Sequence, residues 1–204
     1  MKIKYNSEIL SACTDEEFLY YLLTVPYCGR SSGNYITNDI VATSAYKTFN
    51  INTRQKSTCD DRISSLLIKG VLNGEKIDKG KYIIRKPDSE SWQYYSYIDE
   101  DLIDKILNSN CRNKPALIRV LCAVLISRDA KTKYKICHMP LSYFTSSLHK
   151  SKTTIITCLD TLVALNILDK TTRGKHQTTL YSLLEDSKRE EPGPDKGIDD
   201  SSPF

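Results

Sequence analysis

The residues of this chain that are best suited to chemistry are basic and hydroxyl-bearing side chains in two similar runs. The first run reads NTRQKS (residues 52–57) and the second reads KSKTT (residues 150–154). Lysine and arginine neutralise phosphate charge, while threonine, serine, asparagine and glutamine form hydrogen bonds with phosphates or base edges. Both runs therefore predict non-covalent binding of a nucleic acid.

The sequence lacks the patterns of an enzyme or a metal site. Its seven cysteines include no pair with the spacing of a zinc knuckle, and its three histidines are scattered. It has no glycine-rich phosphate loop, nucleophile elbow or helical histidine pair. The acidic runs at residues 60–61 and 99–101 lack a third ligand and are interpreted as solvated helix residues. We therefore expect reduced core thiols, no cofactor, no metal and no enzymatic activity.

Composition and charge set the class of protein and of partner. With 40% hydrophobic and 26% charged residues the chain is typical of a globular protein. No apolar run could span a membrane and the first residues lack a secretion signal, which predicts a cytoplasmic protein. Residues 185–204 contain seven acids and three bases, a net charge of −4, against +8 for residues 1–184. The basic body suggests a polyanion partner, and the acidic end suggests a different one.

The second basic run lies in a region whose pattern predicts three helices and a hairpin. Apolar residues recur at helical spacing over residues 113–127, 139–148 and 152–166. Ser151 is suited to the N-cap of the third helix. Residues 167–172 and 178–184 are predicted strands on either side of a turn at Gly174.

This order of helix, helix, tight turn, helix and basic hairpin resembles the winged helix-turn-helix pattern over about 45 residues. The resemblance implies that the start of the third helix faces a groove of the nucleic acid and that the hairpin, or wing, touches phosphate. The first half of the chain repeats the plan. Helices are predicted at residues 15–26, 34–50 and 52–72, and a basic hairpin follows, with a turn at Asn73-Gly74.

The expected fold is therefore mainly α with small β-hairpins, an α+β arrangement of two tandem winged-helix domains. The first domain spans residues 1–88 and the second spans residues 89–184, which opens with a strand and a helix at 89–110. Residues 185–204, rich in acids, proline and glycine, are predicted to be a disordered tail.

The winged-helix resemblance implies DNA contacts from the helix starts and the wings of both domains. In the first domain the candidates are Thr53, Arg54, Gln55, Lys56, Lys76, Lys79, Lys81, Arg85 and Lys86. In the second domain they are Lys150, Lys152, Thr153, Thr154, Arg173, Lys175, His176 and Gln177. We expect the acids to lie away from these bases.

An aromatic cluster follows the first wing and consists of Trp92, Tyr94, Tyr95 and Tyr97. Such rings can stack on the bases of a single strand. They can equally pack between the two domains, and this second interpretation is the one we favour from sequence.

The chain ends in DKGIDDSSPF, residues 195–204. This end resembles the C-terminal tip of bacterial single-stranded-DNA-binding proteins, in which a disordered acidic segment ends in aspartates and Pro-Phe. In that family the phenyl ring fills a hydrophobic pocket on a replication or repair enzyme, whose basic residues receive the carboxylates. The resemblance implies this partner-binding role for Asp199, Asp200, Pro203 and Phe204. It departs from the family at residues 201–202, two serines where another acid and an aliphatic residue are usual.

We therefore expect a non-enzymatic protein of DNA replication or recombination that binds single-stranded DNA and recruits host replication or repair enzymes through its tail. Its unusual body combined with such a tail suggests a phage, plasmid or other mobile genetic element. The alternative is a sequence-specific duplex binder, either a replication initiator or a transcription regulator. A third hypothesis is a protein-interaction adaptor, because some winged helices bind only protein. The oligomeric state stays open.

Overall fold

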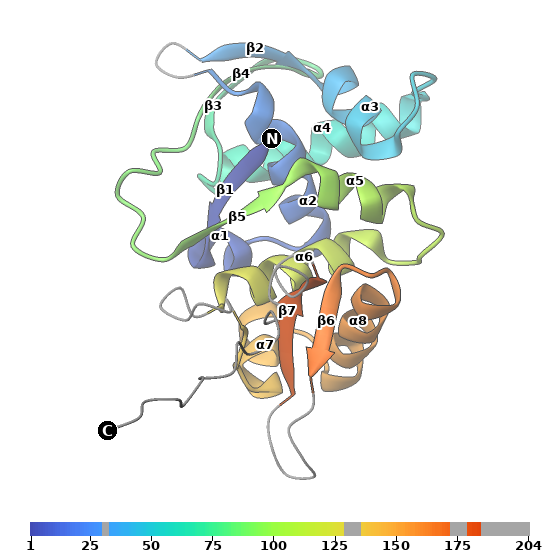
Figure 1. Ribbon diagram of the computed structural model, residues 1–204. Coiled ribbons are helices and arrows are strands. Elements are labelled where there is room, and N and C mark those ends of the chain that lie inside the picture. Colours follow the sequence, from blue (N-terminus) through green and yellow to red (C-terminus); the bar gives the residue numbers. More distant parts are fainter. Residues whose placement is uncertain (30–32, 129–135, 172–178, 185–204) are drawn as a thin grey trace, which may run out of the picture.

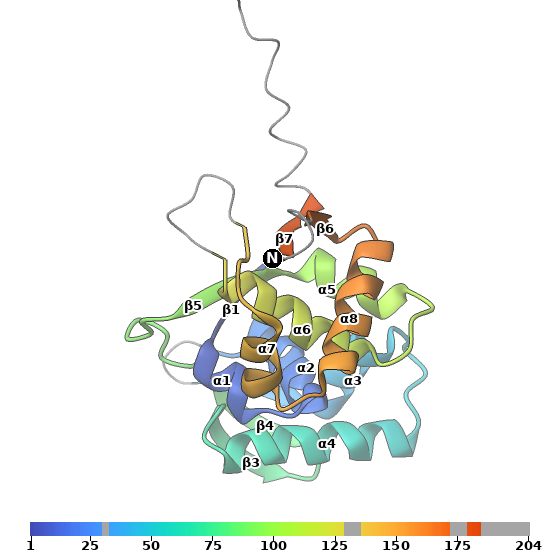
Figure 2. The same ribbon diagram turned by 90° about the horizontal axis from the view of Figure 1, so that it is seen from below.

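A computed structural model describes residues 1–29, 33–128, 136–171 and 179–184 (Figures 1 and 2). Its helices are α1 (Ser7–Ala12), α2 (Asp15–Thr24), α3 (Asn38–Tyr46), α4 (Thr53–Ile68), α5 (Glu100–Asn108), α6 (Lys114–Ile126), α7 (Leu141–Leu148) and α8 (Lys152–Ala164), with a short 3-10 turn, η1 (Val25–Tyr27). Its strands are β1 (Lys2–Asn6), β2 (Asn34–Thr37), β3 (Asn73–Asp78), β4 (Lys81–Arg85), β5 (Tyr95–Asp99), β6 (Leu168–Thr171) and β7 (Leu180–Leu183). The expected α+β class is confirmed.

Two parts of the chain repeat one order of elements. In the first part α2, β2, α3, α4, β3 and β4 follow one another, and the antiparallel sheet has the order β2-β4-β3. In the second part α6, the bridge residue Cys137, α7, α8, β6 and β7 follow one another, and Cys137 pairs with Tyr181 of β7. The last strand therefore has a similar position in both parts. In the first part β4 lies between β3 and β2, and in the second part β7 lies between β6 and Cys137. Both β2 and Cys137 precede the two middle helices of their part. The domain boundary at residue 88 stays a prediction.

A two-stranded antiparallel sheet joins the first residues of the chain to its middle, because β1 pairs with β5. One face of this sheet is buried and carries Ile3, Tyr5 and Ile98. The hydroxyl of Tyr5 donates a hydrogen bond of 2.8 Å to the carbonyl of Cys122 in α6. The sheet is therefore fixed on α6, and its other face is left for solvent.

Helix α6 forms the centre of the core. Every residue from Ala116 to Leu125 is buried, as a helix that is apolar on nearly all sides requires. It packs against α2 on one side and α8 on the other, and it lies between the two halves of the molecule in Figure 1. One continuous cluster of buried side chains therefore includes both halves.

Helix starts follow the sequence signals closely. The Ser151 side chain accepts a hydrogen bond from the amide of Thr154, which confirms it as the N-cap of α8. Thr14 and Asn52 form full capping boxes at the starts of α2 and α4. Such caps satisfy amide groups that the first helical turn leaves unpaired.

Three local expectations from sequence differ from the structure. Residues 34–37 form strand β2 and not the start of a helix, because they pair with β4. Asn73 and Gly74 lie within strand β3, and the hairpin turns at Lys79-Gly80. Strand β1 was not expected, although its sequence KIKYN alternates as a half-buried strand should.

A buried arginine joins four helices. Arg119 of α6 is 3% exposed, and its guanidinium donates to the carbonyl of Leu10 at the end of α1 from two nitrogens, at 2.8 and 3.0 Å. It also donates to the carbonyl of Leu148 at the end of α7 and pairs with Asp15 at the start of α2, at 3.1 Å. Lys150 pairs with the other oxygen of Asp15 at 2.5 Å. The network therefore fixes the helices around α6 relative to one another.

We predict that Arg119→Ala lowers the free energy of unfolding by about 3–5 kcal/mol, because it leaves a cavity and removes the cation that the buried acceptors bind. Urea denaturation followed by far-UV circular dichroism measures the loss. The matched control is Arg112→Ala, since Arg112 is an exposed arginine of the α5–α6 connection and should change stability by no more than about 0.5 kcal/mol. Equal effects of the two variants would contradict the structural role of Arg119.

Candidate nucleic-acid interface

The start of α4 presents part of the first basic run to solvent. Thr53 and Arg54 are exposed in its first turn. Gln55 forms the capping box of α4 with Asn52. Each of the two side chains accepts a hydrogen bond of 2.9 Å from the backbone amide of the other residue. The capping box thus engages Gln55 and leaves the side chains of Thr53, Arg54 and Lys56 without a capping bond.

The hairpin turn between β3 and β4 lies against the start of α4. Asn38, the first residue of α3, makes both connections. Its side-chain amide donates to the carbonyl of Lys56 at 3.2 Å, and its backbone amide donates to the carbonyl of Gly80 at 2.9 Å. Asn38 therefore bridges the turn at Gly80 to Lys56 in the first half of α4.

Asp60 of α4 anchors the hairpin from the other side. Its carboxylate accepts from the Lys76 ammonium at 2.7 Å, from the Gly80 amide at 2.9 Å and from the Tyr82 hydroxyl. Burial alone would raise the pKa of this carboxyl group, but these three donors outweigh it and hold the pKa below its usual value. The expectation that Asp60 is merely a solvated helix residue is therefore wrong.

Gly80 is required at the turn for two physical reasons. Its φ is +70°, in the left-handed region that residues with a Cβ rarely adopt. A Cβ at this position would also lie 2.5 Å from the side-chain amide nitrogen of Asn38. The close approach of the hairpin to α3 and α4 therefore depends on the left-handed conformation of Gly80 and on its lack of a side chain.

Acids pair with several of the predicted DNA-contacting cations, so the expected separation of acids from bases is wrong. Lys56 pairs with Asp39 at 3.0 Å and Lys81 pairs with Asp78 at 3.2 Å, and all four side chains are largely exposed. In the described part of the chain, the predicted DNA-contacting lysines and arginines that form no ion pair are Arg54, Lys79, Arg85, Lys86 and Lys152.

The start of α8 is less basic than the sequence suggested. Lys152 and Thr153 are exposed, while Thr154 contributes its amide to the helix cap. The Lys150 side chain is only 15% exposed and belongs to the ion-pair cluster around Arg119. We therefore leave Lys150 out of the proposed contact surface.

Two groups of predicted residues lie outside the described residues. The first is the second wing, which comprises Arg173, Lys175, His176 and Gln177. The second is the partner-binding tail, which comprises Asp199, Asp200, Pro203 and Phe204. Their roles stay predictions.

The outer face of the β1–β5 sheet is basic and aromatic. Lys2 and Lys4 alternate with the buried residues of β1, and Tyr95 and Tyr97 alternate with those of β5. Lys4 lies opposite Tyr97 in the pairing of the two strands. We call these four residues, together with Trp92, the aromatic face.

Lys4 orders the aromatic face. Its ammonium lies 3.8 Å from the centre of the Tyr95 ring and 5.6 Å from that of Trp92, and it donates to the carbonyl of Ser89 at 2.6 Å. Cation–π contacts of this kind hold rings in place without burying them. Sequence reasoning missed Lys2 and Lys4, although the alternation of KIKYN could have identified them.

The tyrosines of the cluster do not pack between the two halves of the molecule. Tyr94, Tyr95 and Tyr97 are 74%, 46% and 45% exposed, so the packing interpretation that we favoured from sequence is wrong for them. Trp92 is half-buried and packs against the core. Three rings are therefore accessible to a ligand.

Strand β4 connects the hairpin turn to the aromatic face. Lys81, Ile83 and Arg85 alternate with the buried Tyr82 and Ile84, so they share one face of the strand. Lys86 follows directly and lines a cavity with Lys4, Trp92 and Tyr97. The cations of the turn thus lie on a strand whose extension, at Lys86, lines a cavity together with Lys4 of the aromatic face.

No described feature supports metal or thiol chemistry at these surfaces. Among the described residues, no three histidine, cysteine or acidic side chains cluster as metal ligands would. Burial raises the pKa of Cys13 to about 11 and those of Cys28 and Cys59 to about 12, so these thiols stay protonated at neutral pH. The same part of the chain contains no helix with the length and apolarity to cross a bilayer.

Comparisons with known proteins provide no relative. The chain matches no protein-family description, no curated protein and no solved structure. The function therefore has to be argued from the surfaces described above.

We predict that Asp60→Asn lowers the free energy of unfolding by about 1–3 kcal/mol at pH 7, because Lys76 loses its partner. The pKa of Asp60 is held below the usual value of an aspartate in the folded protein, so its charge stabilises the fold above that usual value and this contribution is lost as the pH falls through the lowered pKa. The difference between the two proteins should therefore shrink in acid, as urea titrations at several pH values would measure.

The matched control is Asp61→Asn, because Asp61 is the exposed neighbour on the same helix and loses the same charge. A pH-independent difference for Asp60→Asn, or an equal effect of both variants, would contradict the anchoring role.

Proposed function

We propose that the protein is a non-enzymatic single-stranded-DNA-binding protein of replication or recombination, encoded by a mobile genetic element. The observation that carries the proposal is the aromatic face, where the exposed tyrosines of β5 lie beside the lysines of β1 on the outside of the β1–β5 sheet. Aromatic rings stack on unpaired bases of any sequence and contribute about 1–3 kcal/mol per base. Lysines beside them neutralise the phosphates of the same strand.

The proposal includes two winged-helix units. The support for it is the recurring element order, the central position of β4 in its sheet, and the pairing of β7 with both β6 and Cys137. In this interpretation α4 and α8 are the third helices, and β3–β4 and β6–β7 are the wings. The unpaired cations Arg54, Lys79 and Arg85 would then follow the DNA backbone toward the aromatic face.

The tail would act on proteins and not on DNA. We propose that the Pro-Phe end and its aspartates recruit a host replication or repair enzyme, as the resemblance to the tip of bacterial single-stranded-DNA-binding proteins implies. The negative charge of residues 185–204 favours this division, since an acidic segment repels phosphates.

A second candidate function is sequence-specific binding of duplex DNA, as a replication initiator or transcription regulator. It is favoured by the contact between the hairpin turn and the first half of α4, together with the exposure of Thr53 and Arg54 in the first turn of that helix. Such a surface suits a helix start in a major groove with a wing on the backbone.

We predict that a poly-pyrimidine single strand binds more tightly than random duplex DNA, because only the single strand offers unpaired bases to the tyrosines. Fluorescence anisotropy at two salt concentrations measures both, and the single-strand affinity should fall steeply with salt. Weak binding to both until a particular duplex site is supplied would favour the second candidate. No binding to either at low salt would leave a protein-interaction adaptor.

We also predict that deleting residues 199–204 leaves the affinity for single-stranded DNA equal or higher, because an acidic tail competes with DNA for the basic body. The same anisotropy titration compares the two proteins. A clear loss of DNA binding after the deletion would contradict the proposed division between body and tail.

A further inference from the structure

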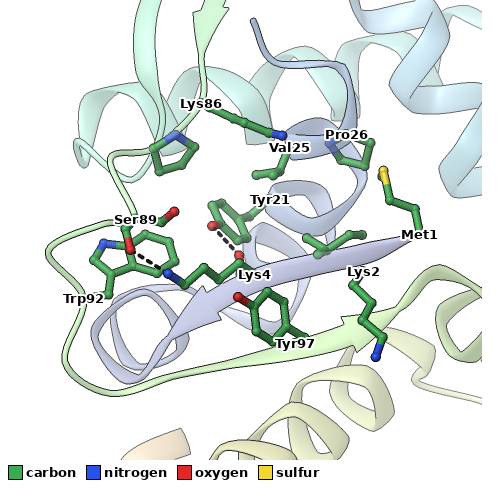
Figure 3. Close-up of a pocket in the computed structure, with 12 residues that line it drawn as sticks. Met1, Lys2, Lys4, Tyr21, Val25, Pro26, Lys86, Ser89, Trp92 and Tyr97 are labelled. Carbon is green, nitrogen blue, oxygen red and sulfur yellow. Dashed lines mark hydrogen bonds between the residues drawn. The ribbon is translucent and has the colours of Figure 1, made fainter. Parts of the chain in front are cut away.

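A cavity of about 220 Å³ lies between β1, the end of α2 and the segment that follows β4. Figure 3 shows Trp92 and Tyr97 on one side of it, Val25 and Pro26 on the other, and Lys86 along its edge. Trp92 and Tyr97 also belong to the aromatic face, so the cavity opens beside the surface proposed to bind the strand.

The size of the cavity limits what can enter it. Pockets for drug-sized ligands are roughly 300–1,000 Å³, and this one is about 220 Å³. It therefore suits a single heterocyclic ring system and excludes two stacked bases.

The walls select a planar, uncharged group. Val25, Pro26 and Pro87 contribute apolar surface, and Trp92 and Tyr97 contribute rings. Apolar contact and aromatic stacking together favour a nucleobase over a small inorganic anion, which would gain nothing from these side chains.

The charges around the cavity select a phosphate next to that group. Of the described residues that line it, three are lysines and none is acidic. Lys4 is engaged by Ser89 and Tyr95. Lys2 and Lys86 are exposed, have no ion pair among the described residues, and lie at different parts of the edge in Figure 3.

We infer that this cavity receives one unpaired base of a bound single strand of DNA, with the flanking phosphates at Lys86 and Lys2. The inference rests on the proposed single-strand binding and specifies where a base is held. Trp92 also lines a second hollow of about 520 Å³ together with Asn6 and Tyr94. The neighbouring nucleotides therefore have room in this second hollow, which shares the Trp92 side chain with the first.

Trp92 is the only tryptophan of the chain, so its emission reports on any base that stacks against its ring. The full-length protein is titrated with an oligothymidylate and with an abasic strand of equal length, whose phosphates and spacing match but which has no bases. Anisotropy of labelled strands measures binding in parallel. We expect the oligothymidylate to quench Trp92 as it saturates the protein, and the bound abasic strand to leave the emission nearly unchanged.

Lys86→Glu tests the phosphate position, and Arg112→Glu is its control with the same change of charge at an exposed site away from both surfaces. We expect Lys86→Glu to weaken oligothymidylate binding by about tenfold at low salt. Arg112→Glu should leave both affinity and quenching close to those of the parent protein.

Four results would overturn the inference. If the oligothymidylate binds without changing Trp92 emission, the base lies elsewhere and single-strand binding still stands. If the abasic strand quenches equally, or if both charge variants lose affinity equally, the cavity has no specific role. If no strand binds at low salt, the proposed function itself fails, and the inference fails with it.

Discussion

The guanidinium of Arg119 lies where four helices meet, and a buried cation is stable only while its hydrogen bonds are made. Its two bonds to the carbonyl of Leu10 fix the end of α1. Strand β1 runs directly into α1, where the Asn6 side chain caps the helix by accepting from the amide of Ile9 at 2.8 Å. The position of β1, and with it the outer face of the β1–β5 sheet, therefore depends on a residue far away in the sequence.

The ion pairs of the predicted DNA-contacting cations are of two kinds, nearly buried and exposed. Lys150 is nearly buried between helices, and breaking its ion pair with Asp15 would create an uncompensated charge there. Lys56 and Asp39 are both exposed, and such pairs contribute only about 0–1 kcal/mol. A phosphate can therefore replace Asp39 at little cost, whereas none can replace Asp15. Sequence shows the charge of a residue but not which of these two situations it is in.

The sequence predicted features that depend on neighbouring residues. It did not predict features that depend on a contact with a residue far away in the chain. The Ser151 cap and a helix with a buried stripe at residues 113–127 follow from spacing and residue type, whereas the burial of α6 on nearly all sides goes beyond that stripe. The role of Asp60 could not be predicted, because its donors include Tyr82 on a strand 22 residues away. The exposure of Tyr95 and Tyr97 depends on β1, whose pairing with β5 brings residues 2–6 beside residues 95–99. A pattern of aromatic residues does not itself reveal which face of a strand is covered.

The two candidate surfaces differ in what they require of a nucleic acid. The start of α4 and the hairpin turn offer cations and hydroxyl groups, which suit the backbone of either a single strand or a duplex. The aromatic face offers rings, and a duplex hides the faces of its bases in the stack, so these rings would contribute little to duplex binding. Exposing three tyrosines to water has no benefit for folding, because burial would stabilise the protein further. The exposure of these tyrosines and the row of side chains along one face of β4 therefore favour a single-stranded ligand that uses both surfaces.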